Sequence, residues 1–206
     1  MWRNTCHDGR VTATPQRLLE AAEDLLLEQG QAATTLRDIT QRAEANVAAV
    51  SYHYGSKDAL LALAYRQALE EVTQVQRQRL AELPPDADLD QVVRVWLAPA
   101  LDQQDPRQAK LWALIQRGMA ERAPGLIEGM GEIRQTVDDH LIERLAAALP
   151  HLDREELYLR HAATLAAVSA LQTGGMDLLI EGTPARLADE LVAWIVGGLR
   201  APAAGA

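Results

Sequence analysis

The stretch Thr34–Lys57, TTLRDITQRAEANVAAVSYHYGSK, decides the fold. Thr35 and Asp38 have the spacing of a capping box, which predicts the start of a short helix. Asn46 follows a break in the pattern and can cap a second short helix over residues 47–53. Two short helices separated by a few turn residues are typical of a helix-turn-helix.

The second short helix has the composition of a surface that enters a groove of double-stranded DNA. Val47 and Val50 are expected to turn inward. The remaining side chains are small, or carry a polar tip at the C-terminal end of the helix, and they are Ala48, Ala49, Ser51, Tyr52 and His53. Alanine methyls can touch thymine methyls, and serine can hydrogen-bond a base edge or a phosphate. The N-termini of the flanking helices add backbone N–H groups that attract anions.

The rest of the chain is predicted as further helices, about nine in total, and the fold class as all-α. Residues 1–13 lack a hydrophobic period and are predicted to be a mobile arm. Leu and Ala recur at helical spacing. Helix starts are predicted at Thr14–Pro15, Asp105–Pro106 and Asp153, and Gly174–Gly175 is predicted to loosen the helix that contains it. The expected segments are 14–29, with Gly30 as a stop, 35–43, 47–53, 57–83, 88–101 with Pro99 near its end, 106–119, 124–149, 154–180 and 184–199.

Composition excludes several classes of protein. The chain has 206 residues, of which 48% are hydrophobic and 4% aromatic. Cys6 is the single cysteine, so an intramolecular disulfide framework and a Cys-rich zinc site are excluded. No apolar run reaches the roughly 18 residues of a membrane span, and the first residues are polar. We expect a soluble, cytoplasmic protein that contacts no membrane.

The charge distribution bears on the choice of partner. The net charge is −9, which taken alone argues against nucleic acid. Residues 1–57 hold six Lys and Arg against seven Asp and Glu, whereas the remainder holds 14 against 22. The acidity therefore lies mostly in the second part of the chain, and the helix-turn-helix is close to neutral.

Residues from about Thr14 to Tyr65 resemble the DNA-binding domain of TetR-type transcriptional regulators. The resemblance is carried by RLLEAAEDLLLEQG (17–30), TTLRDITQRA (34–43) and VAAVSYHYGSKDALL (47–61). It covers about a quarter of the chain, and the remainder agrees in length and helix count.

The resemblance implies a set of DNA contacts. It implies backbone contacts from Thr35, Tyr52, His53 and Lys57. It implies base contacts from Ala48, Ala49 and Ser51. We add Arg37 and Asn46 to the predicted DNA-binding residues.

Glu44 departs from the family pattern, because the turn Ala43–Asn46 lacks the glycine often found there. Glu44 is expected to adopt a left-handed conformation at a cost of about 1 kcal/mol. It also places a negative charge near the DNA.

The segments 46–57 and 152–158 are similar to the corresponding segments of PsrA-like fatty-acid-responsive repressors, a branch of this family. That similarity implies an effector of fatty acyl type.

The second part has the composition of a ligand-binding and dimerising domain. An effector pocket is expected to be mostly apolar with a few polar groups. The predicted lining residues are Trp96, Trp112, Met119, Met130 and Leu141, with Arg117 and His140 placed to orient a polar head. Ordinary core packing is the alternative for each of them. His140 and Glu143 are one turn apart, but a single pair predicts no metal, and no cofactor is predicted.

The last two helices are predicted to form the homodimer interface. Residues 155–180 and 185–199 are expected to pair with their copies as a four-helix bundle. The Ala-rich face of the first permits close approach; it comprises Ala162, Ala163, Ala166, Ala167 and Ala170. Intramolecular packing of these alanines is the alternative. In the last helix, Leu187, Leu191, Trp194 and Ile195 are expected to face inward.

The sequence therefore predicts four segments. They are an arm (1–13), a DNA-binding domain (14–60), a ligand-binding and dimerisation domain (61–200) and a tail (201–206). The predicted function is a repressor released from a pseudo-palindromic operator by an apolar small molecule. Two alternatives stay open: an all-α dimeric interaction module without DNA binding, and an all-α enzyme acting on an apolar substrate.

Overall fold

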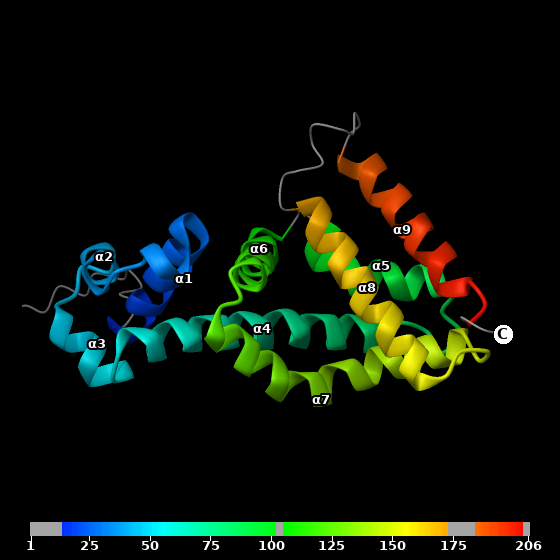
Figure 1. The fold of residues 1–206 in the computed structure, drawn as a ribbon, viewed down its shortest axis with the longest axis horizontal. Helices are drawn as coiled ribbons and strands as arrows, with labels where there is room; N and C mark the ends of the chain where they lie inside the picture. Colours follow the sequence, from blue (N-terminus) through cyan, green and yellow to red (C-terminus); the bar gives the residue numbers. More distant parts are fainter. Residues whose placement is uncertain (1–13, 102–104, 173–183, 204–206) are drawn as a thin grey trace, which may run out of the picture. The chain divides into compact units, whose positions relative to one another are not determined.

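The computed structural model describes residues 14–101, 105–172 and 184–203 (Figure 1). These residues form helices and the turns between them, without a strand, as the composition predicts. The predicted arm and the Gly174–Gly175 pair lie outside the described residues. No helix among those described is both long and apolar enough to span a bilayer.

The chain divides into two compact units between Ala64 and Tyr65. The first unit contains α1 (Thr14–Ala33), α2 (Leu36–Arg42), α3 (Val47–Tyr54) and the first two turns of α4 (Lys57–Glu82). The second unit contains the rest of α4 together with α5 (Leu89–Leu101), α6 (Pro106–Ala120), α7 (Pro124–Ala148), α8 (Arg154–Gln172) and α9 (Pro184–Arg200).

The core of the first unit draws on each of its helices. The apolar side chains that are at most 1% exposed come from α1, α2, α3 and α4, and they include Leu18, Leu26, Ile39, Val50, Leu60 and Leu61. Their helical spacing produces the three-helix packing of α1, α2 and α3. Gly30 breaks α1 at the predicted stop, with φ at 82°, and its carbonyl accepts a 2.6 Å hydrogen bond from the Thr34 hydroxyl.

Helix starts in the second unit follow the predicted caps. The Asp105 carboxylate accepts from the N–H groups of Arg107 and Gln108 at the start of α6. The Asp153 carboxylate accepts from the N–H of Glu156 at 2.8 Å, at the start of α8. Pro99 does not end α5, which continues to Leu101 with the proline buried inside it.

Tyr65 of α4 lies directly against Gly118 of α6. Tyr65 is fully buried, and burial raises the pKa of its phenol to about 12. A Cβ added to Gly118 would lie 2.6 Å from Cε1 of Tyr65 and 2.8 Å from Leu126 Cδ2. Glycine is therefore required here by space, since its φ is ordinary.

α9 buries a stripe that includes Ile195, as predicted, but not Trp194. The buried residues are spaced as one helical stripe and consist of Val192, Ile195, Val196 and Leu199. Trp194 is 65% exposed, so its predicted inward orientation is wrong. The error arises because residues 191, 194 and 195 also have helical spacing, and spacing alone does not fix which stripe meets α5. The side chain of Leu187 lies outside the described residues.

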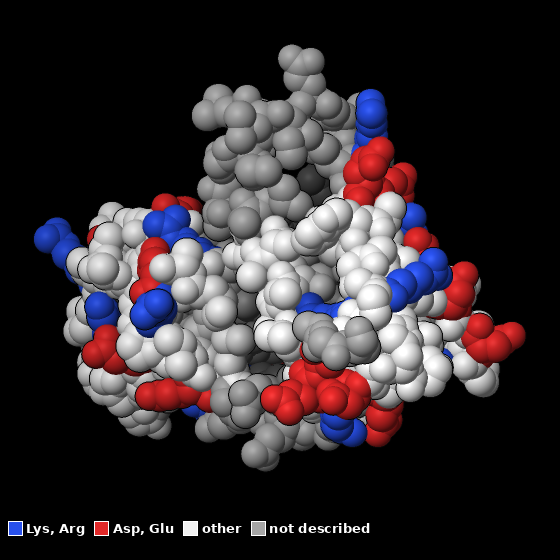
Figure 2. Space-filling model, turned by 45° about the vertical axis from the view of Figure 1, so that its right-hand side comes forward, with Lys and Arg blue, Asp and Glu red and all other residues white. Residues whose placement is uncertain are grey.

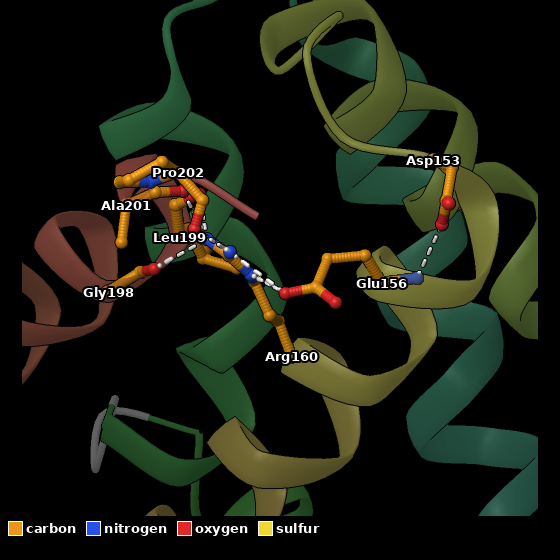
Figure 3. A network of polar contacts seen from close by, with 7 residues as sticks. All are labelled: Asp153, Glu156, Arg160, Gly198, Leu199, Ala201 and Pro202. Atoms are coloured by element: carbon orange, nitrogen blue, oxygen red, sulfur yellow. Dashed lines mark hydrogen bonds and ion pairs between the residues drawn. The ribbon is translucent and has the colours of Figure 1, made fainter. Parts of the chain in front are cut away.

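Arg160 of α8 holds the C-terminal end of α9 (Figure 3). One guanidinium nitrogen donates to the carbonyls of Gly198, Leu199 and Ala201 at 2.7 to 2.9 Å. The other terminal nitrogen of the guanidinium group donates to the Pro202 carbonyl at 2.9 Å. The carboxylate of Glu156 accepts from the other side of the same group at 3.0 Å. The last turn of a helix has carbonyls without N–H partners, and one arginine satisfies several of them here.

Candidate nucleic-acid interface

The start of α2 is held by a reciprocal cap. The Thr35 hydroxyl accepts from the Asp38 N–H at 3.2 Å, and the Asp38 carboxylate accepts from the Thr35 N–H at 3.2 Å. The Thr35 hydroxyl also donates to that carboxylate at 2.6 Å. These bonds, led by the hydroxyl, lower the pKa of Asp38. The capping box predicted from spacing is confirmed, and it fixes where the chain enters the helix-turn-helix.

The turn between α2 and α3 passes through Glu44 in the left-handed region, with φ at 48°. The expected backbone conformation of Glu44 is thereby confirmed. The Ala45 N–H donates to the Thr40 carbonyl at 2.9 Å, which closes the turn. The Glu44 side chain is exposed. The strain of the turn therefore falls on a residue whose charge faces solvent.

α3 is a helix with almost no buried face. The Asn46 side chain caps it by accepting from the Ala49 N–H at 2.8 Å, and Val50 is its one buried residue at 1% exposed. Tyr52 is 83% exposed. Val47 is 51% exposed, so its predicted inward orientation is wrong. Val47 is the first residue of α3 and lies three positions before Val50. The rotation of the helix brings Val50, but not Val47, against the core.

Two polar contacts fix the C-terminal end of this region. The Tyr54 hydroxyl donates to the Pro15 carbonyl at 2.7 Å, and partial burial raises the pKa of that phenol. The Lys57 ammonium donates to the Thr34 carbonyl at 2.9 Å. These contacts tie α3 to the first turn of α1 and α4 to the residue that follows α1, so α3 is positioned without burying its outer face.

All nine predicted DNA-binding residues lie at the surface of the first unit. Seven are exposed and two, Ala49 and Lys57, are partly buried. An open hollow of about 530 Å³ runs beside α3. It is lined by Ala48, Ala49, Tyr52 and His53 of α3, by the turn residues 44–46, and by Thr14 and Arg17 of α1.

Arg17 and Thr14 were missed by the sequence analysis as candidate site residues. They lie about thirty positions before α3 in the chain, and no local spacing rule connects them to it. The Thr14–Pro15 helix start was a usable signal for where α1 begins, but not for what lies beside it.

One cation of the first unit is neutralised by a close carboxylate. Arg42 forms a two-pronged contact with Glu28 at 2.7 Å for each oxygen, which lowers the pKa of that carboxyl. Where described residues are visible in Figure 2, Lys and Arg lie singly among Asp and Glu rather than in one broad basic patch. Any anion bound here would therefore rely on individual cations and helix ends.

The predicted effector residues are distributed between the core and the surface of the second unit. Trp96, Trp112 and Leu141 are at most 7% exposed, whereas Met119 is 42% exposed. Trp96 stacks on His161 with ring centres 4.8 Å apart. Arg117 pairs with Glu121 at 2.9 Å, and Met130 is partly buried.

A second hollow, of about 910 Å³, lies between α4 and α7. Of the predicted effector residues, only His140 lines it, and the structure does not bring the seven into either hollow. The His140 ring nitrogen is 3.8 Å from a Glu143 oxygen, and among the described residues no three potential ligands gather as a metal site would require.

Comparison with known proteins identifies the family. Residues 18–64 match the model for bacterial regulatory proteins of the tetR family. Residues 94–198, about half of the chain, match the tetracyclin repressor-like C-terminal domain. The chain therefore belongs to the TetR family of bacterial regulatory proteins.

Individual relatives agree with this assignment. The HTH-type transcriptional repressor Rv3405c of Mycobacterium tuberculosis is 31% identical over 134 residues, which is 64% of each chain. CymR of Pseudomonas putida, an HTH-type transcriptional regulator, is 30% identical over 63% of this chain and 60% of the relative. The match thus spans less than two thirds of these relatives. The family and these relatives are regulators, so the enzyme alternative is set aside.

Solved structures share the fold. The fatty acid degradation regulator FadR from Bacillus halodurans superimposes with a TM-score of 0.70 at 15% identity, covering 93% of this chain and 99% of that one. Salmonella enterica GusR gives a TM-score of 0.63 at 21% identity, covering 93% and 95%. At these identities the likeness establishes the arrangement of helices.

Proposed function

We propose that this protein is a cytoplasmic DNA-binding transcriptional repressor that inserts α3 into the major groove. The observation that carries the proposal is the exposure of α3: it buries Val50 alone, while its ends are fixed by Asn46 and Tyr54. A helix held by its ends presents its whole outer face to a partner. The width of the major groove suits one such helix.

The proposed contacts follow from chemistry and position. Ala48, Ala49 and Ser51 lie near the start and middle of α3, where small side chains permit close approach to base edges. Arg37, Tyr52 and His53 are exposed donors suited to phosphate oxygens, and Thr35 and Lys57 lie at the ends of neighbouring helices. Asn46 uses its oxygen for the cap, which leaves its amide N–H groups for DNA.

Homodimerisation is proposed through α8 and α9. Leu159 and Trp194 are 64% and 65% exposed, and the exposed alanines of α8 include Ala162, Ala163 and Ala166. Large apolar side chains beside small ones offer area and close approach, as a helix-bundle interface requires. A two-fold dimer would read two half-sites about 34–36 Å apart.

We further propose that an apolar small molecule binds the second unit and releases the DNA. The support is the match of residues 94–198 to a tetracyclin repressor-like C-terminal domain, and the repressor name of the mycobacterial relative. A coupling of about 1–3 kcal/mol between the two ligands is enough for graded induction. Fatty acyl compounds are the first class to test, as the PsrA-like resemblance implies.

The decisive experiment is a mobility-shift titration with DNA from upstream of the protein's own gene. We expect a salt-sensitive complex that Tyr52→Ala weakens about tenfold, because Tyr52 is 83% exposed and its loss leaves the core intact. Met119→Ala, which truncates an exposed side chain of α6, is the matched control. Lys57→Ala needs an unfolding curve beside it, since this ammonium also bonds to Thr34.

The interaction module without DNA binding is the second candidate. The acidic Glu44 beside α3 favours it, since a carboxylate repels phosphate. Absence of any complex with upstream or random DNA at low salt would favour this candidate and reject the repressor.

Effector binding is tested by thermal unfolding with acyl compounds, antibiotics and aromatic acids. A ligand that binds only the native state raises the midpoint of unfolding. A true effector must also shift the DNA titration. A compound that raises the midpoint but leaves DNA affinity unchanged would contradict the coupling.

A further inference from the structure

Arg17 lies in α1, outside the helix-turn-helix, yet its side chain lines the hollow beside α3. The side chain is partly buried. Its contact with the Thr14 hydroxyl is long, at 3.5 Å from a terminal guanidinium nitrogen. Its Nε is buried without a hydrogen-bond partner. A buried donor without an acceptor is costly, and none of the described residues supplies an acceptor for this nitrogen.

The other cations of the described first unit are differently placed. Arg42 is neutralised by Glu28, and Lys57 donates to a backbone carbonyl. Arg37 is exposed on α2 and does not line the hollow. Arg17 is thus the cation of the hollow, and it has no carboxylate within ion-pair distance in the described part of the chain.

The position of Arg17 relative to α3 is fixed. The Tyr54 hydroxyl holds the Pro15 carbonyl at 2.7 Å, and this ties the first turn of α1 to the last turn of α3. A guanidinium two residues further along α1 therefore keeps its place beside Ala48, Ala49 and Tyr52. A helix in the major groove is flanked on both sides by the phosphate backbone.

We propose that Arg17 binds a phosphodiester oxygen of the DNA strand that borders α3. This contact rests on the proposed DNA-binding function and adds a residue to it from α1. Guanidinium groups bind phosphate through two parallel N–H donors, and the half-buried stem reduces the freedom that such a bond must remove. The chemistry is indifferent to base sequence, because phosphates are alike at every position.

The test compares full-length variants by fluorescence anisotropy. The probes are a duplex selected in vitro by the wild-type protein and a scrambled duplex of equal length, each titrated from 50 to about 300 mM salt. The variants are Arg17→Gln, Arg17→Lys and Arg200→Gln, the last removing an exposed charge at the end of α9.

Arg17→Gln is expected to weaken binding to both duplexes alike. Each lost phosphate contact reduces the magnitude of the negative slope of log affinity against log salt by about 0.9, so a dimer that makes the contact twice loses about 1.8. Arg17→Lys retains the charge and most of the slope, whereas Arg200→Gln retains the wild-type affinity and slope. Far-UV circular dichroism and the unfolding midpoint establish that each variant is folded.

A second measurement uses the wild-type protein, in case Arg17→Gln does not fold. Phenylglyoxal modification followed by mass spectrometry is expected to show protection of Arg17, but not of Arg200, by the selected duplex. An unchanged slope, or equal modification of Arg17 with and without DNA, overturns the phosphate contact alone. A loss confined to the selected duplex indicates base reading and also overturns it. If the wild-type protein binds neither duplex, this inference and the proposed function fail together.

Discussion

α3 and α9 differ in how much of each helix is buried. α3 buries Val50 and is otherwise fixed at its ends, by the Asn46 cap and by the Tyr54–Pro15 hydrogen bond. α9 buries a full apolar stripe and is also clamped at its end by Arg160. A helix fixed by polar contacts at its ends leaves its faces available for a partner, whereas a helix fixed by a stripe leaves only the opposite face. The contrast locates the proposed DNA surface on α3 and confines the proposed dimer surface of α9 to the side of Trp194.

The largest expected effect is at the α9 clamp. Arg160→Met removes the donor to four carbonyls and leaves the Glu156 carboxylate, 21% exposed, without its partner. We expect the free energy of unfolding to fall by about 3 kcal/mol, measured by urea denaturation.

Arg200→Gln is the control for the loss of a charge, because Arg200 is exposed. A midpoint unchanged by Arg160→Met would mean that the apolar stripe alone holds α9.

Next in size is the effect of Trp194→Ala on self-association. Trp194 is 65% exposed within one chain, so its truncation should leave folding intact. If α9 lies at the dimer interface, the dissociation constant rises by about 30-fold, which corresponds to about 2 kcal/mol. Analytical ultracentrifugation measures it. Met119→Ala serves for comparison, and equal behaviour of the two variants would move the interface elsewhere.

Val50 and Val47 provide a matched pair within α3. Val50→Ala removes two buried methyl groups and should cost about 1.5 kcal/mol of stability, whereas Val47→Ala, at an exposed site, should change it by less than about 0.5 kcal/mol. Thermal unfolding of both variants measures this difference in stability. Equal losses would contradict the end-held description of α3.

The last prediction is a gain in stability at Glu44. Glu44→Gly relieves the positive φ and should add about 1 kcal/mol to the free energy of unfolding. It also removes a negative charge from the hollow, so DNA affinity should rise. Glu44→Gln separates the two causes, because it removes the charge and keeps the strained backbone. A stability gain with Gln equal to that with Gly would contradict the backbone explanation.

Local rules predicted much of this fold because they act within a few residues. The Thr35–Asp38 capping box, the Asn46 cap and the Asp105 cap each depend on side chains that reach backbone groups two or three positions away. The left-handed Glu44 followed from a turn that lacked glycine.

Contacts between distant segments were not predictable from spacing. Arg160 reaches carbonyls about forty positions later, and Arg17 meets α3 across the fold of the first unit. The inward faces assigned to Val47 and Trp194 were wrong because helical spacing gives several equivalent stripes, and packing chooses among them. The proposed effector residues share composition without sharing a hollow, since an apolar side chain suits a core and a pocket equally.

The uninterrupted course of α4 affects how the protein can be shortened. The division between the units falls between Ala64 and Tyr65, after only two turns of a helix that continues to Glu82. A fragment ending at Ala64 would strip the last four carbonyls of α4 of their N–H donors, which belong to residues 65–68. An isolated DNA-binding fragment must therefore carry at least one additional turn, ending no earlier than Ala68.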